Sequence, residues 1–310
     1  MSVVQMLAGD ARITRYPHPL KQAAEARFAP FRDHPAVTTY RRLSARGFAY
    51  NRVPEAMLSL DPHTLAIAPI AADPAQSAGG EQALREWFVT LRDFAAVTRF
   101  DAWMAQQSPT HARAVNAVRP QVTTALSRLE RYLGAPLGET HVVLGPLLHD
   151  GGFAATRGSD AHTQAWAFIG PQYNTTVPDF GDAQRLEGLI SHEFAHTLIN
   201  RWTAEHPQAV ARSAHQFTDM REAMRRQAYG NWPTVVNESI IRAITARLVA
   251  QAQGETAGDA LVFEEVARGF RHLPTLIAAL RSYEGERSRY PTLRTYMPQL
   301  LAAFEPQVPS

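Results

Sequence analysis

Two histidines and a glutamate lie within one short segment, His192-Glu193-Phe194-Ala195-His196. Histidines four positions apart on a helix project from the same side, so both can bind a single metal ion. The glutamate between them is then placed to take a proton from the attacking water. The spacing therefore predicts a hydrolase that binds one Zn²⁺ ion through His192 and His196 and uses Glu193 as its general base.

The residues around this segment predict the helix that the spacing requires. Leu186, Ile190, Phe194 and Leu198 recur every four positions, as in a helix whose one face packs into a core. The alternative is a buried helix whose two histidines are satisfied without a metal. A glutamate beside two histidines on an apolar helix needs a compensating charge, and this favours the metal site.

A zinc hydrolase needs a third protein ligand and one open position for water. A histidine six residues past His196 would supply that ligand in a short-spaced pattern, but the position is occupied by Trp202. Residues 233–250 are largely apolar, begin with a proline that suits the first turn of a helix, and contain one acid, Glu238. An unpaired buried carboxylate is costly, so we predict Glu238 as the third ligand.

Two other interpretations of the acidic residues stay open. Arg242 lies one helical turn after Glu238, so it is either the partner of a purely structural carboxylate or the residue that orients a ligand. The rival ligands, both in polar segments, are Glu205 and Glu222.

The paired histidines followed by Asn237-Glu238 on a later helix resemble the gluzincin branch of the zinc metallopeptidases. The Ser-Asp that often follows in thermolysin-like enzymes is absent, and Ile240-Ile241-Arg242 stands in its place, which argues against close kinship to thermolysin. More narrowly, most of the chain resembles a bacterial family of unknown function with a predicted metallopeptidase core. That resemblance implies a zinc-dependent fold and little about the substrate. The segments that carry it are 7–9, 28–37, 192–200 and 237–243.

The resemblance also implies a hydrogen-bond donor opposite the metal, which in related enzymes is a downstream tyrosine or histidine. Tyr290, in Ser288-Arg289-Tyr290-Pro291, is the candidate here. Asn200, two turns past His192, either supports a ligand or simply lies near the end of the helix. The rivals of Tyr290 are Tyr229, Tyr283 and His272.

Length and composition limit the class of protein. At 310 residues and 45% hydrophobic residues, the chain can form one or two domains with a substantial core. No apolar run approaches about 18 residues, so no membrane span is expected. Cysteine is absent, which excludes disulfides and cysteine-bound zinc. The first residues lack a basic leader, so a cytoplasmic location is the default, or a periplasmic or secreted one if a signal peptide has been removed.

The distribution of charge argues against nucleic acid as a partner. The formal net charge is only +2, and Lys21 is the sole lysine beside many arginines. Basic and acidic residues are interspersed, and no basic stripe is interleaved with stacking aromatics. The expected partner is a peptide or protein substrate, and no feature of the sequence indicates the oligomeric state.

The order of predicted elements indicates an α+β protein with a mostly helical N-terminal half. We expect a mainly helical region at 1–135 and a zincin-like domain at 136–310, in which a small mixed sheet precedes the active-site helices. The resemblance to zincins implies that residues 163–170 are an edge strand that pairs with an extended peptide, the alternative being an ordinary sheet edge. The other expected elements are strands at 1–10, 140–148 and 151–156, and helices at 81–106 and 110–133 separated by a turn at 108–110.

The motifs together predict a zinc-dependent peptidase. The alternative is a non-catalytic zinc-binding or peptide-binding protein on a zincin fold. Glu193 argues against it, because a purely structural zinc site keeps no open position and needs no base. Hydrolysis of a non-peptide amide is a further possibility that the sequence does not separate from peptidase action.

Overall fold

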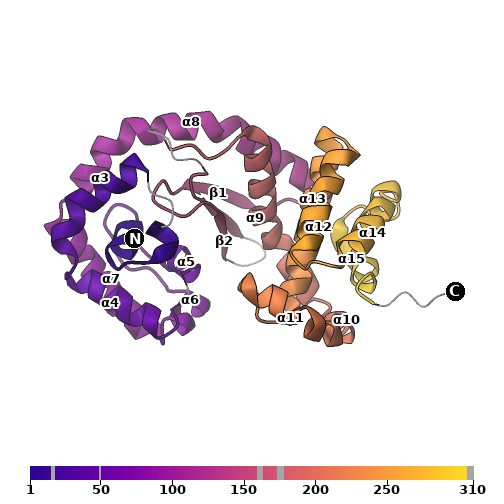
Figure 1. Ribbon diagram of the computed structural model, residues 1–310, viewed down its shortest axis with the longest axis horizontal. Helices are drawn as coiled ribbons and strands as arrows, with labels where there is room; N and C mark the ends of the chain where they lie inside the picture. The colour runs from indigo at the N-terminus through magenta and orange to yellow at the C-terminus, as the bar shows by residue number, and fades with distance from the viewer. Residues whose placement is uncertain (15–17, 49, 159–162, 173–177, 306–310) are drawn as a thin grey trace. The chain divides into compact units, whose positions relative to one another are not determined.

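The computed structural model describes residues 1–310 except 15–17, 49, 159–162, 173–177 and 306–310 (Figure 1). The chain divides into two compact units that interleave along the sequence. The first comprises 1–120, 141–159 and 166–182, and the second comprises 121–140, 160–165 and 183–310. We expected a single division of the sequence after residue 135. In the structure, most residues of the sheet belong instead to the same unit as the N-terminal helices. His192, His196 and Glu238 all belong to the second unit.

Helices predominate among the described residues, and three strands form one small mixed sheet, which confirms the predicted α+β class. The core of the first unit is aromatic: the Trp87 ring stacks on Tyr40 at 5.7 Å, and its Nε1 donates to the carbonyl of Ala36 at 3.1 Å. The helices that begin in this unit are α1 (Ser2–Leu7), α2 (Ala11–Thr14), α3 (Pro19–Phe28), η1 (Ala29–Phe31), α4 (Pro35–Ala45), α5 (Arg52–Met57), α6 (Ala72–Ser77), α7 (Glu81–Val97) and α8 (Phe100–Leu133).

Two sequence-based expectations for the first unit are wrong. Residues 2–7 form helix α1 instead of a strand; Val3 to Leu7, including the polar Gln5, are all buried, and so short a buried segment carries no clear periodicity. The break between the long helices falls at Thr98 and Arg99 instead of 108–110. Arg99 takes a left-handed conformation with φ of 51°, which ends α7, whereas Pro109 lies inside α8.

The sheet has the order β1-β3-β2, with β1 at Glu139–Leu144, β2 at Gly152–Arg157 and β3 at Gln164–Ile169. The Gly145 amide donates to the Ile169 carbonyl at 2.8 Å, so the ends of β1 and β3 meet and these strands are parallel. The Gly170 amide donates to the Gly151 carbonyl, so β3 and β2 are antiparallel. All three strands were expected, but the edge-strand prediction for 163–170 is wrong. As the central strand, β3 pairs on both sides and has no free edge for a peptide.

The second unit is built around α12 (Trp232–Gln253), which packs against α9, α13 and α14. The Asn231 side chain caps α12 by accepting from the Thr234 amide at 3.0 Å, and Pro233 lies in the first turn, as expected. Gly254, with φ of 97°, ends it. The other helices are α9 (Ala183–Ala204), α10 (Pro207–Arg212), η2 (Ala214–Gln216), α11 (Phe217–Arg226), α13 (Glu255–Ala267), α14 (Leu273–Gly285) and α15 (Leu293–Ala302).

A buried arginine connects three of these helices. Arg247 of α12 donates to both carboxylate oxygens of Glu284 on α14, at 2.9 and 2.7 Å, and to both of Glu255 on α13, at 3.0 and 2.7 Å. Its side chain is 6% exposed, and that of Glu284 is 20% exposed. Tyr132 of α8 donates a further hydrogen bond to Glu284 at 2.9 Å. The network therefore holds α13 and α14 in place on α12.

We expect Arg247→Met to lower the free energy of unfolding by about 3 kcal/mol, because it leaves the half-buried Glu284 without its cation. Urea unfolding followed by circular dichroism measures this loss. The matched control is Arg281→Met, since Arg281 is 48% exposed and pairs with Glu255 at the surface, so its loss should stay below about 1 kcal/mol. Equal losses in the two variants would contradict a stabilising role for the buried network.

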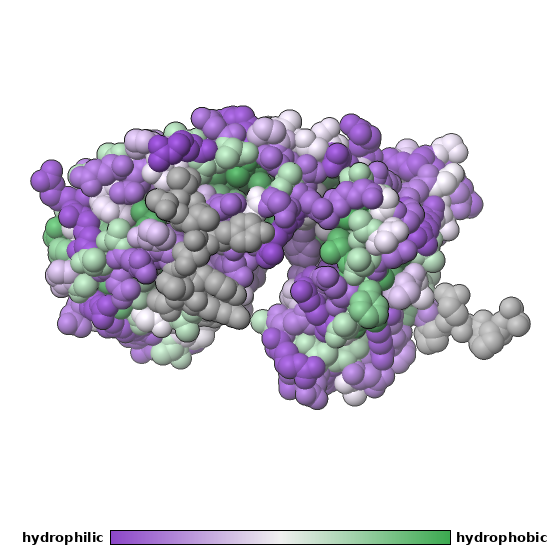
Figure 2. Space-filling model, turned by 45° about the horizontal axis from the view of Figure 1, so that its top comes forward, coloured by the Kyte–Doolittle hydropathy of each residue, from purple (hydrophilic) through white to green (hydrophobic). Residues whose placement is uncertain are grey.

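On the face drawn in Figure 2, hydrophilic residues predominate and hydrophobic ones occupy small separate areas. The most exposed large hydrophobic side chain among the described residues is Phe263 of α13, at 77%. No helix of the described part of the chain is long and apolar enough to cross a membrane.

Candidate metal centre

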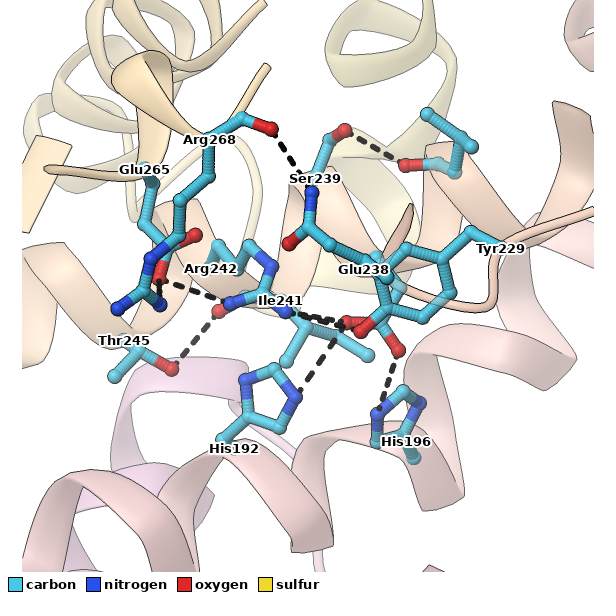
Figure 3. Close-up of polar contacts among 12 residues, drawn as sticks. His192, His196, Tyr229, Glu238, Ser239, Ile241, Arg242, Thr245, Glu265 and Arg268 are labelled. Carbon is cyan, nitrogen blue, oxygen red and sulfur yellow. Dashed lines mark hydrogen bonds and ion pairs between the residues drawn. The ribbon is translucent and has the colours of Figure 1, made fainter. Parts of the chain in front are cut away.

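Helix α9 presents His192 and His196 one turn apart, on the side that faces α12 (Figure 3). Their ring centroids are 5.2 Å apart, with the ring planes at 76°. The carboxylate of Glu238 on α12 lies across from both rings. Its Oε2 is 3.6 Å from His192 Nε2, and its Oε1 is 3.5 Å from His196 Nε2. The helix spacing thus directs two imidazole nitrogens and one carboxylate toward a common point.

The three predicted ligands together can hold a metal ion. One ligand atom from each of His192, His196 and Glu238 lies within 4.8 Å of the other two. The Glu238 side chain is only 9% exposed, and its buried Oε2 accepts no hydrogen bond. A buried carboxylate oxygen that accepts no hydrogen bond is stabilised by positive charge, which Arg242 Nη2 supplies from 3.3 Å, and the residues fit a metal cation between this carboxylate and the two rings.

A neighbouring amide orients one of the two histidines. His196 Nδ1 lies 3.3 Å from Asn200 Oδ1, one turn further along α9. In the tautomer in which Nδ1–H donates to this amide oxygen, Nε2 is free to bind a metal. Asn200 therefore contacts a predicted ligand, in agreement with one of the two roles expected of it. Asn237, next to Glu238, instead accepts a hydrogen bond from Thr203, which joins α12 to α9.

Glu193 lies on the same turn of α9 and is buried, at 8% exposure, without being one of the three ligands. Burial and, to a smaller extent, the negative charge of Glu238 raise the pKa of its carboxyl to about 8, and Arg242 opposes the shift. Burial, then the charges of His196 and Arg242, hold the pKa of His192 well below its usual value. His192 is therefore a neutral imidazole at neutral pH, the form that binds metals.

The carboxylate of Glu238 has a cationic neighbour on its own helix. Arg242 Nη2 lies 3.3 Å from Glu238 Oε2, and Arg242 Nη1 donates to Glu265 Oε1 of α13 at 3.0 Å. Helix α13 can approach because Gly258 faces α12 without a side chain; a Cβ there would lie 2.8 Å from the Ala246 carbonyl oxygen. Sequence reasoning found Arg242 but missed Glu265, which no local spacing connects to the motif.

Tyr229, in the loop between α11 and α12, lies beside the carboxylate of Glu238 (Figure 3). Its hydroxyl accepts a hydrogen bond from Arg242 Nη2 at 3.0 Å. The end of α11 places it there: the Tyr229 amide donates to the Met224 carbonyl, and the Ala228 amide to that of Arg225. Ala228 occupies the left-handed position usually taken by glycine, with φ of 67°. Burial, then the negative charge of Glu238, raises the pKa of Tyr229.

The structure does not bring the remaining candidates to this group. The hydroxyl of Tyr290 accepts from Gln299 at 3.1 Å, and its ring packs on Tyr296 at 4.9 Å. Tyr283 donates to the carbonyl of Tyr132 at 2.9 Å in a buried position. The others form these contacts: His272 packs against Trp232 and Phe304, Glu205 pairs with Arg294, and Glu222 pairs with Arg226.

The fold and the site define an α+β protein with two histidines and a glutamate that can hold a metal ion. The chain belongs to a family described as a domain of unknown function (DUF4932), whose sequence model matches residues 8–303. No curated protein and no solved structure matches it. Membership of a family of unknown function agrees with the resemblance noted in the sequence, and membership of the gluzincin clan stays a prediction.

Proposed function

We propose that the protein is a zinc-dependent hydrolase that cleaves amide bonds, with peptides as its substrates. The proposal rests on one observation above the others. Glu193 is buried beside His192, His196 and Glu238 but is not one of the three ligands. Three protein ligands with a free carboxylate beside them are typical of a catalytic zinc site, because one position of the ion stays open.

Zinc suits the two imidazoles and one carboxylate better than the harder ions Mg²⁺ and Ca²⁺, which prefer oxygen ligands. When bound, Zn²⁺ supplies Lewis-acid activation of the attacking water and of the scissile carbonyl. His192, His196 and Glu238 would hold the ion, and Asn200 would keep His196 in the ligating tautomer.

Glu193 has the role of general base and then of general acid. Its carboxylate takes a proton from the water as the water attacks, and it delivers that proton to the leaving amine. Its burial keeps solvent from competing for the proton. A base of this kind works best when its pKa lies near the working pH, and burial moves the pKa of Glu193 in that direction.

A cleavage screen with a metal assay tests the proposal. We expect about one Zn²⁺ per chain by mass spectrometry of the metal content, and cleavage of a peptide library that a chelator stops and Zn²⁺ restores. Bound zinc without cleavage of peptides would favour a peptide-binding protein or hydrolysis of another amide. Absence of any bound divalent ion would contradict the proposal.

Tyr229 is our proposed donor to the negatively charged oxygen that develops during hydrolysis, in place of Tyr290. Its hydroxyl lies beside the ligand Glu238, whereas the contacts of Tyr290 are with α15. We expect Tyr229→Phe to lower kcat by about 10²–10³-fold with little change in KM, as for loss of an oxyanion donor. Tyr290→Phe is the matched control and should leave kcat unchanged. A large loss of kcat in Tyr290→Phe but not in Tyr229→Phe would instead identify Tyr290 as the donor.

A further inference from the structure

Arg242 is a buried cation between two carboxylates, and only one of them belongs to the metal group. Its side chain is 15% exposed. Nη2 lies 3.3 Å from Oε2 of the ligand Glu238, and Nη1 donates to Oε1 of Glu265 at 3.0 Å. The guanidinium also lies over the ring of Phe270, 4.4 Å from its centroid. Nη2 also donates to the Tyr229 hydroxyl at 3.0 Å, so four neighbouring groups fix the position of the guanidinium.

Among the described residues that pair with Glu238, Arg242 is the nearest cation, with Nη2 3.3 Å from Oε2. The two histidine nitrogens that face this carboxylate are 3.5 and 3.6 Å away, further than the guanidinium of Arg242. A buried carboxylate needs a compensating charge. The guanidinium of Arg242 supplies that charge at the oxygen, Oε2, that accepts no hydrogen bond.

Glu265 can hold the guanidinium of Arg242 when a metal ion binds Glu238. The hydrogen bond between Nη1 and Oε1 of Glu265 does not involve Glu238. Nη2, which faces Glu238, also donates to the hydroxyl of Tyr229 at 3.0 Å. Glu265 and Tyr229 would therefore still hold the guanidinium when Glu238 binds a metal.

We propose that Arg242 is a placeholder cation for the metal: it neutralises Glu238 while the site is metal-free, and Glu265 retains it when the ion takes Glu238. This inference rests on the proposed metal site, but not on hydrolysis. Arg242 and the ion carry like charges and share one carboxylate, so each weakens the binding of the other. Arg242 is thus a positioning residue that makes the metal-free fold stable and metal binding weaker.

The inference predicts opposite effects for the two partners. Arg242→Met should tighten Zn²⁺ binding by about tenfold, because the competing cation is gone. Glu265→Gln should weaken it by about tenfold, because Arg242 then keeps Glu238 as its carboxylate partner. Competition titration against a chromogenic chelator measures both dissociation constants. The matched control is Arg247→Met on the same helix, whose carboxylate partners are Glu255 and Glu284, and it should leave the dissociation constant unchanged.

Thermal unfolding tests the same coupling through stability. Arg242→Met should lower Tm by several degrees without metal and by clearly less when Zn²⁺ is saturating. Arg247→Met should lower Tm equally in the two conditions. If Arg242→Met does not fold, Arg242→Lys keeps the charge and should bind Zn²⁺ within about threefold of the wild type. Weaker binding in Arg242→Met, or equal Tm losses with and without metal, would overturn the inference.

A measurement without metal separates this inference from the proposed function. In the metal-free protein, Glu238→Gln should remove most of the Tm loss caused by Arg242→Met, because no charge then needs a partner. Additive Tm losses in the double variant would contradict the pairing of Arg242 with Glu238. If these results hold and no substrate is cleaved, the placeholder stands and the hydrolase proposal fails.

Discussion

Glu193→Gln should retain about one Zn²⁺ per chain while its kcat falls by about 10²–10⁴-fold, the usual contribution of a general base. The amide has the shape of the carboxylate but cannot accept a proton from water at neutral pH. Metal binding should survive because Glu193 is not one of the three ligands. Metal analysis and hydrolysis of the best library peptide, performed on the same preparation, measure both quantities.

A second glutamate on α9 provides the control for that substitution. Glu187 lies on the same helix and pairs with Arg128 at 2.5 Å, so Glu187→Gln changes the same functional group away from the ligands. Its kcat should stay within about twofold of the wild type, since a surface ion pair contributes little. If Glu193→Gln is as active as Glu187→Gln, Glu193 is not the base. If Glu193→Gln also loses its zinc, Glu193 helps to hold the ion.

The three residues of the candidate metal centre were predictable because each depends on a pattern within a single helix. The spacing of His192 and His196 and the apolar repeat around them are local properties of α9. Glu238 was found as the one acid in an apolar helix, where a buried charge demands a partner. Such arguments need no knowledge of how helices pack, and the structure brings these three residues together.

The positions of the residues around the candidate metal centre depend on how the helices pack, and the sequence predicted them poorly. Glu265 reaches Arg242 only because α13 folds back closely onto α12 at Gly258. Tyr229 follows the end of α11, where Ala228 takes the left-handed conformation. Glycine usually occupies such a position, so the sequence lacks the residue that would have indicated this turn. Tyr290 is also a tyrosine downstream of the histidines, but its hydroxyl contacts Gln299 of α15 instead of the candidate metal centre.

The fold class was predictable for the same reason, and the errors arose where local patterns are ambiguous. A short, mostly apolar segment such as residues 2–7 fits a buried strand or a buried helix equally well. All three strands were located from local sequence, β3 by its alternation, but the order β1-β3-β2 is set by pairing between distant segments. A substrate strand therefore cannot add to β3, and any peptide bound by sheet pairing would have to use β1 or β2.

Glu238→Ala should lose the metal, with Zn²⁺ affinity falling by more than the roughly 10–100-fold that loss of an outer hydrogen-bond partner costs. The remaining imidazoles, His192 and His196, would form a site of only two protein ligands without a negative charge. The fold should survive, because Glu265 still compensates the charge of Arg242. Zn²⁺ titration and circular dichroism of the same sample separate loss of the ion from loss of structure.

The two rival acids make this prediction specific to Glu238. Glu205 pairs with Arg294 at 2.9 Å, and Glu222, with a side chain 91% exposed, pairs with Arg226 at 2.7 Å. Glu205→Ala and Glu222→Ala should therefore bind Zn²⁺ as tightly as the wild type. Zinc retained in Glu238→Ala but lost in either control would give the third coordination position to that acid. Zinc retained in all three would mean that the two histidines bind the ion with a ligand other than these acids.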